Sequence, residues 1–257
     1  MATAVGSRCS TRYAVIGAGP PVLLLPGWFV PGSGWGPLIP HLAAGHRVIA
    51  VDHGATSVGA GERRALGITG MAAAAVGVLD DAGVGAAHVV GNSLGGVVAQ
   101  ALATRHPERV LSLVLLATSP GTPSIPPNPL LLLNGLRALR RQPHVRAAQA
   151  RGRPRGSSGR AAQLLVPLGW CGLRELRRVQ ARTLVLHGSR DRVVPLTNAR
   201  LLASLVPCAQ LIVVEGAGHL ILSDAPEQVA EAISEFLVGL NVLAHGALGM
   251  MVLAQVS

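Results

Sequence analysis

The chain has 257 residues, of which 49% are hydrophobic and 2% aromatic, so it can bury a sizeable core built mainly from Leu, Val, Ala and Ile. All 22 basic residues are arginine, and 12 of them lie between Gly121 and Arg182 against one acidic residue. Three widely spaced cysteines without a C-x-x-C pair argue against a disulfide framework and against a zinc site. We expect a cytoplasmic protein without a secretory leader.

The arginine-rich segment has two readings. Such a patch attracts acidic substrates, anionic surfaces or nucleic acid, or it is a solvated face in an arginine-biased chain. Nucleic acid is the least favoured partner, because the segment has one aromatic residue, Trp170, and no recognition motif. A weak contact with an anionic surface therefore stays open beside the solvated face.

Short apolar runs alternate with helical patterns along the chain. We expect strands at 3–16 (two short ones), Val22–Leu25, Arg47–Asp52, Ala87–Val90, Val110–Ala117, Thr183–His187 and Gln210–Val214. We expect helices at Trp35–Ala44, Ile68–Gly83, Val97–His106 and Asn198–Leu205, and a final helix that begins with a capping box of Asp224 and Glu227. Unbroken apolar strands between helices indicate a parallel sheet covered on both faces, and ligands bind beyond the carboxyl ends of such strands.

The region 121–179 interrupts this alternation and is interpreted as a lid inserted into a core of 1–120 and 180–240. It opens with a proline-rich run, and an amphipathic helix with leucines on one side and arginines on the other follows. A loose surface excursion is the alternative. Residues 241–257 are assigned to a peripheral or disordered extension, because the glycine and polar residues in this uncharged stretch make it a poor membrane span.

The most informative stretch is Ala87–Gly96, interpreted as a strand, a sharp turn and a helix. Gly91-Asn92-Ser93-Leu94-Gly95 fits the G-x-S-x-G pattern, in which the turn raises a serine hydroxyl above the sheet. The glycines are required because the strand and the helix pass too close for a Cβ. The pattern alone is weak evidence in a chain with 32 glycines, and the alternative is a glycine-rich loop, so the buried strand and helix around it carry the interpretation.

Serine attacks only when a base lies within hydrogen-bond reach and a carboxylate holds that base in the right tautomer. Asp191 follows one strand by four residues, and His219 follows the last strand by five. Each has an ordinary alternative, as a turn aspartate or a loop histidine, but the order serine, aspartate, histidine is the one expected of this kind of sheet. We predict Ser93 as nucleophile, His219 as base and Asp191 as the acid, with His53 as the substitute base.

An acyl transfer also needs backbone amides that bind the oxyanion. We expect these donors to be the amides of Leu94 and Trp28, with Phe29 as the second choice for the latter. An apolar substrate pocket is predicted, and its expected residues are Phe29, Leu132, Leu136, Leu168 and Trp170. No metal and no cofactor is expected.

From about Tyr13 to Leu237 the chain resembles the α/β-hydrolase superfamily. The stretches that carry the resemblance are Leu23–Trp28, Val48–Asp52, His88–Gly96, His106–Val110, Thr183–Pro195 and Gly216–His219. The resemblance implies an α/β fold with a mostly parallel sheet, helices on both faces and a short helical lid, and it implies the same roles for Ser93, Asp191 and His219. Two loops depart from the usual pattern: Pro26-Gly27 replaces His-Gly, and His53–Ser57 replaces R-G-x-G-x-S.

Within the superfamily, three stretches are similar to intracellular polyhydroxyalkanoate depolymerases: Leu115–Gly121, Gln163–Trp170 and Pro195–Pro207. The expected activity is hydrolysis of a carboxylic ester, with a hydrophobic acyl or hydroxyacyl group, through an acyl-enzyme on Ser93. Lactone hydrolysis, C–C bond hydrolysis and cofactor-free haloperoxidase chemistry use the same three residues. A non-catalytic ligand receptor on the same fold is the alternative from another class of protein. The expected partner is a small or polymeric ester, not nucleic acid.

Overall fold

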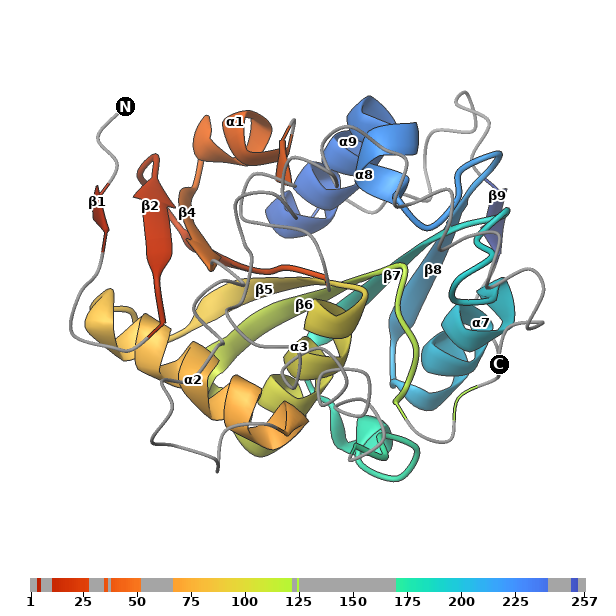
Figure 1. Cartoon of the computed structure of the whole chain (residues 1–257), viewed down its shortest axis with the longest axis horizontal. Helices are drawn as coiled ribbons and strands as arrows, with labels where there is room; N and C mark the ends of the chain where they lie inside the picture. The colour runs from red at the N-terminus through yellow and green to blue at the C-terminus, as the bar shows by residue number, and fades with distance from the viewer. Residues whose placement is uncertain are drawn as a thin grey trace, which may run out of the picture.

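The computed structural model describes residues 4–5, 11–27, 35–36, 38–51, 67–121, 124, 170–239 and 251–253. Within these residues nine strands form one sheet in the order β1-β2-β4-β3-β5-β6-β7-β8-β9 (Figure 1). The strands are Ala4–Val5 (β1), Tyr13–Ile16 (β2), Pro21–Leu25 (β3), Arg47–Val51 (β4), Ala87–Asn92 (β5), Val110–Leu116 (β6), Arg182–Gly188 (β7), Ala209–Val214 (β8) and Met251–Leu253 (β9).

The centre of the sheet, from β4 through β3, β5, β6 and β7 to β8, is parallel, and antiparallel strands flank it. Its strands are apolar on both sides because both faces of the sheet are covered. The register sets Leu25 beside Gly91, and Gly188 beside Val214. The carboxyl ends of these strands therefore meet at one edge, where Ser93, Asp191 and His219 follow β5, β7 and β8.

Two groups of helices cover the sheet (Figure 1). On one face lie α1 (Leu38–Ala43), α8 (Ile221–Asp224) and α9 (Pro226–Val238), and on the other lie α2 (Ile68–Asp81), α3 (Leu94–Arg105) and α7 (Leu196–Leu205). Each face has its own apolar cluster: Leu24, Leu38 and Ile233 are buried in the first, and Leu79 and Val98 in the second. The central strands are packed between the two clusters, which fixes the sheet edge where Ser93, Asp191 and His219 lie.

The predicted strands and helices of the described residues are found with their ends shifted by a few residues. The shift that matters for the site concerns α3, which begins at Leu94 rather than at the predicted Val97. Because Ser93 precedes α3 directly, the helix starts at the turn itself. The fold class is thus the predicted α/β sheet with helices on both faces.

The predicted capping box of the final helix is wrong. The helix α9 begins at Pro226 after Ala225, and no side chain caps it. Proline at the first helical position needs no hydrogen-bond acceptor and has a φ suited to a helix, so the start does not depend on Asp224. Asp224 ends α8 instead, and its Oδ2 accepts a hydrogen bond of 2.8 Å from the Gly218 amide.

Several predictions fall on residues outside the described ones. These are the amphipathic helix and most of the proposed lid, the arginine cluster on it, and the residues Trp28, Phe29, His53, Leu132, Leu136 and Leu168. From the extension 241–257 the structure describes Met251–Leu253, which pairs antiparallel with β8. None of the helices in the described ranges is long and apolar enough to cross a membrane.

Candidate active site at the carboxyl edge of the sheet

Ser93 stands at the sharp turn between β5 and α3. Its backbone has φ 52° and ψ −116°, a conformation that residues with a side chain rarely adopt. Two contacts from β6 and the residues after it hold this conformation: the Ser93 amide donates to the Leu116 carbonyl over 2.8 Å, and the Thr118 hydroxyl donates to the Ser93 carbonyl over 2.7 Å. The strain is therefore fixed by neighbouring backbone, as in functional turns.

The glycines around Ser93 are required by the close approach of three segments. A Cβ on Gly91 would lie 2.5 Å from the Gly95 carbonyl oxygen and 2.7 Å from Gly96 Cα. A Cβ on Gly95 would overlap the carbonyl oxygen of Leu25, at the end of β3. The glycines of the G-x-S-x-G pattern are thus required because a Cβ would overlap backbone, as predicted from the sequence.

The loops that follow β7 and β8 are tied to each other. The Ser189 amide donates to the Val214 carbonyl over 3.0 Å, and the Arg190 amide donates to the Ala217 carbonyl over 2.9 Å. Because Asp191 and His219 lie directly beyond these bonds, the two loops bring their side chains to the same point above the sheet. The Asp224 carboxylate adds a contact from α8 to the Gly218 amide, next to His219.

Ser93, His219 and Asp191 form one hydrogen-bonded chain. His219 Nδ1 lies 2.8 Å from Asp191 Oδ2, and His219 Nε2 lies 3.1 Å from Ser93 Oγ. An ionised carboxylate only accepts hydrogen bonds, so Nδ1 carries the imidazole proton and Nε2 is free to accept the Ser93 hydroxyl proton. The side chain of His219 is 11% exposed and that of Asp191 is fully buried.

Burial opposes the ionisation of Asp191, but hydrogen bonds from His187 and His219 outweigh it and hold the pKa of its carboxyl well below the ordinary value of 3.8. The amides of Val193 and Val194 donate to Asp191 Oδ1 over 2.8 and 2.9 Å. Asp191 is therefore an anion at neutral pH with all its neighbours donating to it. In the described part of the chain, this site included, no cluster of three His, Cys, Asp or Glu side chains is arranged to hold a metal ion.

The amide of Leu94 is the first of α3, and the first amides of an α-helix have no acceptor within the helix. It is thus available beside Ser93 to an anionic oxygen. The loop after β3 passes close by, since a Cβ on Gly27 would lie 3.1 Å from Ser93 Cβ. This loop leads to Trp28, the predicted second donor, which lies outside the described residues.

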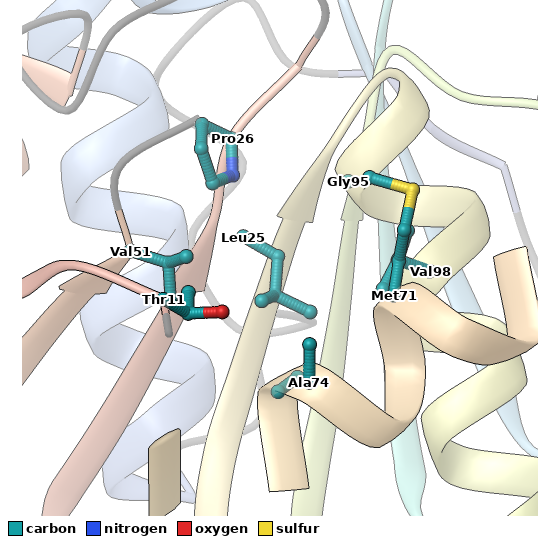
Figure 2. Close-up of a pocket in the computed structure, with 9 residues that line it drawn as sticks. Thr11, Leu25, Pro26, Val51, Met71, Ala74, Gly95 and Val98 are labelled. Atoms are coloured by element: carbon teal, nitrogen blue, oxygen red, sulfur yellow. The ribbon is translucent and has the colours of Figure 1, made fainter. Parts of the chain in front are cut away.

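A small apolar pocket lies behind this turn, on the face covered by α2 and α3. Figure 2 shows Leu25, Pro26 and Val51 at the strand ends, with Met71 and Ala74 on α2 opposite them. The Ser93 side chain is not among the groups that line it. The pocket is therefore separate from the Ser93 hydroxyl.

The structure describes one of the predicted pocket residues, Trp170. Its side chain is 2% exposed and packs in the core cluster that contains α3, with the Arg105 guanidinium 5.8 Å from the ring centroid. The ring also lies against Gly121, at the start of the predicted lid. A contact between Trp170 and a substrate stays a prediction.

The position of His187 on the strand that leads to Asp191 predicts that it packs near the site, and its side chain contacts Asp191. Thr118 and Asp224 were given no role at the site, although their side chains contact Ser93 and the His219 loop. His187 stands next to a glycine at the end of an apolar strand, which is a weak signal. Thr118 and Asp224 carry no pattern that separates them from ordinary loop residues. Their contacts depend on how the loops beyond the strands fold back, which no local pattern specifies.

The parallel sheet and the hydrogen-bonded serine, histidine and aspartate beyond it define a hydrolase of the α/β class. Residues 22–232 match the model of the Alpha/beta hydrolase family, so the chain belongs to that family.

Two relatives and one solved structure are similar to this chain. The chain is 34% identical over 222 residues to the poly(3-hydroxyalkanoate) depolymerase of Ectopseudomonas oleovorans, covering 78% of each. It is 33% identical over 258 residues to the 2-hydroxymuconate semialdehyde hydrolase of a Pseudomonas strain, covering 86% of this chain and 88% of that one. A carboxylesterase from Bacillus subtilis has the same fold, with a TM-score of 0.78, 22% identity and 93% of both chains covered.

Proposed function

We propose that this protein is a serine hydrolase that cleaves a carboxylic ester through an acyl-enzyme on Ser93. The observation that carries the proposal is the hydrogen-bonded chain from Ser93 Oγ through His219 to Asp191, with contacts of 3.1 and 2.8 Å. Serine at neutral pH needs such a base, and the base needs a carboxylate that keeps its proton on Nδ1.

In the proposed reaction Ser93 Oγ attacks the ester carbonyl while its proton passes to His219 Nε2. The imidazolium is stabilised by the Asp191 anion, which stays ionised throughout. The C–O bond to the alcohol breaks as His219 gives it the proton, which leaves the acyl group on Ser93 Oγ. Water then attacks the acyl carbon and gives a proton to His219, and the bond to Oγ breaks as His219 returns that proton to Ser93 and the acid is released. The Leu94 amide is the proposed first donor to the oxyanion, with Trp28 as the second.

The ester assignment is supported by the 34% identical relative, whose name describes a depolymerase of poly(3-hydroxyalkanoate). We propose a hydrophobic acyl or hydroxyacyl ester as the substrate class. The acyl pocket is proposed to include Phe29, Leu132, Leu136, Leu168 and Trp170. This set is apolar and lies on the loop after β3 and on the lid, the segments expected near the strand ends.

Cleavage of a C–C bond next to a carbonyl is the second candidate. It is favoured by the 33% identical relative, which is named for hydrolysis of 2-hydroxymuconate semialdehyde and is matched over 86% of this chain. The same serine, histidine and aspartate serve both reactions, so the substrate decides between them.

A fluorophosphonate probe tests the proposal, because it reacts covalently with an activated serine. We expect the wild-type protein and Ser112→Ala to be labelled, and Ser93→Ala to be unlabelled. Ser112 is a matched control, since it also lies against an imidazole, His88, at 2.8 Å. Labelling that survives Ser93→Ala, or a wild-type protein that is never labelled, would contradict the assignment. Turnover of p-nitrophenyl esters beside a vinylogous 1,5-diketone then separates the two substrate classes.

A further inference from the structure

His187 is a fully buried histidine at the carboxyl end of β7, four residues before Asp191. Its Nε2 lies 2.9 Å from the carbonyl oxygen of Val194 and 3.3 Å from Asp191 Oδ2. The proposed reaction gives this side chain no part. A buried imidazole aimed at the acid of the site therefore needs an explanation.

Both oxygen atoms near His187 Nε2 are acceptors, so this nitrogen must carry a proton. The other ring nitrogen, Nδ1, is buried without a hydrogen-bond partner among the described residues. A second proton on Nδ1 would be a buried donor with no acceptor, which is costly. His187 is thus held in the tautomer with one proton on Nε2, shared between Val194 and Asp191.

The Val194 backbone contacts both His187 and Asp191. The Val194 carbonyl accepts from His187, while the Val194 amide donates to Asp191 Oδ1 over 2.9 Å. The Val193 amide binds the same oxygen over 2.8 Å. One oxygen of Asp191 is therefore fixed by the loop backbone, and the other is left to face His187 and His219.

We propose that His187 is a positioning residue, which fixes the loop through Val194 and fixes the Asp191 carboxylate in the orientation that receives His219. Without the His187 donor, the carboxylate and the Val194 peptide can turn, and His219 loses the partner that aligns its Nε2 with Ser93. The inference deepens the proposed function and rests on it, because a positioned acid matters only if Ser93 reacts.

The charges around the carboxylate agree with this arrangement. The titratable groups that act on Asp191 are His187 and His219, and its chain neighbours Arg190 and Arg192 are exposed. The His187 hydrogen bond is the largest contribution that lowers the pKa of Asp191 against the effect of burial. The loss of this donor therefore destabilises the ionised form of the Asp191 carboxyl and also removes a contact that fixes its orientation.

Two substitutions separate the donor from the bulk of the ring. In His187→Gln the side-chain nitrogen stands as many bonds from Cα as Nε2 does, so it can reach Val194 and Asp191. In His187→Asn the nitrogen stands one bond closer and cannot. Thr183→Val is the control: Thr183 is fully buried on the same face of β7, and its hydroxyl contacts Ala181 instead of the site.

The measurements are kcat and KM for a p-nitrophenyl ester, with melting curves to ensure that each variant is folded at the assay temperature. We expect His187→Asn to lower kcat by about 10- to 100-fold with KM unchanged, because a small displacement of a reacting group has effects of this size. His187→Gln should stay within about threefold of the wild type, and Thr183→Val should match it. The low-field proton NMR signal of the His219–Asp191 hydrogen bond should persist in the Gln variant and vanish in the Asn variant.

Full activity in a folded His187→Asn, or an equal loss in the Gln and Asn variants, would overturn the inference. If the Asn variant does not fold, the Gln variant decides: retained kcat and NMR signal support the donor role, and their loss contradicts it. Fluorophosphonate labelling separates this outcome from failure of the proposed function. A wild-type protein that is not labelled sinks the proposed function, whereas wild type and His187→Asn labelled at the same rate sink the inference about His187 alone.

Discussion

Among the described residues, two contacts join a serine to an imidazole, one at each end of β5. At the carboxyl end, Ser93 Oγ lies 3.1 Å from His219 Nε2, and at the amino end, Ser112 Oγ on β6 lies 2.8 Å from His88 Nδ1. The second contact is the shorter one. Distance between hydroxyl and imidazole therefore does not distinguish a reactive serine from a structural one.

The surroundings of the two imidazoles distinguish them. His219 has the buried carboxylate of Asp191 behind it, whereas His88 faces His46 and Arg182, and burial together with these two groups lowers the pKa of His88. No carboxylate forms an ion pair with His88 within the described ranges. Ser93 also has a φ of 52°, while Ser112 lies within strand β6. The pair of Ser93 and His219 therefore differs from the pair of Ser112 and His88 in two ways: it has a buried carboxylate behind the imidazole, and its serine lies at a strained turn.

The largest expected effect comes from removing the acid. Asp191→Asn keeps the shape of the side chain but allows the wrong tautomer of His219, so kcat should fall by about 10⁴-fold. Steady-state hydrolysis of a p-nitrophenyl ester measures it. Asp80→Asn is the matched control, because Asp80 binds Arg109 at 2.7 Å on the surface. If Asp191→Asn were as active as Asp80→Asn, the Asp191 carboxylate would not be what distinguishes His219 from His88.

The strained turn is tested by adding one methyl group. In Gly95→Ala the new Cβ overlaps the Leu25 carbonyl, so β3 and the turn must move apart. We expect a loss of about 1–3 kcal/mol in the free energy of unfolding, and a fall in kcat of about 100-fold. Denaturant melts and ester kinetics measure the two effects.

Gly77→Ala provides the reference for Gly95→Ala. Gly77 lies in α2, and a Cβ there meets no atom within 4 Å. This change should raise stability by about 0.5–1 kcal/mol, since alanine is the better helix former, and leave kcat unchanged. If both alanines behaved alike, the close approach at the turn would not be the cause.

A smaller effect concerns stability in acid. Because the pKa of Asp191 in the folded protein is well below 3.8, its ionisation stabilises the fold fully above that pH, and this contribution declines as the pH falls further. The melting temperature of the wild type should exceed that of Asp191→Asn by a constant amount near neutral pH, and the gap should narrow below about pH 4. Thermal melts of both proteins between neutral pH and pH 3 check this, and a gap that widens in acid would contradict it.

The smallest effect should follow Ser112→Ala. This change leaves His88 Nδ1 without its partner and should lower the free energy of unfolding by about 1 kcal/mol. Activity should stay within about twofold of the wild type, because Ser112 is remote from the acid. A large loss of activity would mean that the two contacts are not independent.

Much of this fold follows from local pattern. The unbroken apolar strands and the helical spacing between them predict the parallel sheet, and G-x-S-x-G with a strand before it predicts the turn at Ser93. The order of Ser93, Asp191 and His219, each beyond a strand, led to the contacts that the structure has. Each of these sequence signals lies in a short stretch, a strand and the residues that follow it, although the contacts join residues far apart in the chain.

The parts that sequence did not predict depend on how loops fold back and on which strand ends at the sheet edge, and no local pattern specifies either. Asp224 fits a capping box locally, yet Pro226 starts the helix and the carboxylate binds the Gly218 amide in the His219 loop. The contact of His187 with Val194 depends on how the loop after β7 returns over the strand end. The edge strand Met251–Leu253 gains its partner only once β8 is at the sheet edge.

The central claim is that substrate is carried on Ser93 and not on any other hydroxyl. A single-turnover reaction of the protein in excess over a p-nitrophenyl ester, quenched in acid at millisecond intervals and mapped by peptide mass spectrometry, tests it directly. The predicted result is an acyl group that appears and decays on the peptide containing Ser93. Release of p-nitrophenol with no acyl group on Ser93, or with the acyl group on another side chain such as Ser112, would contradict the account.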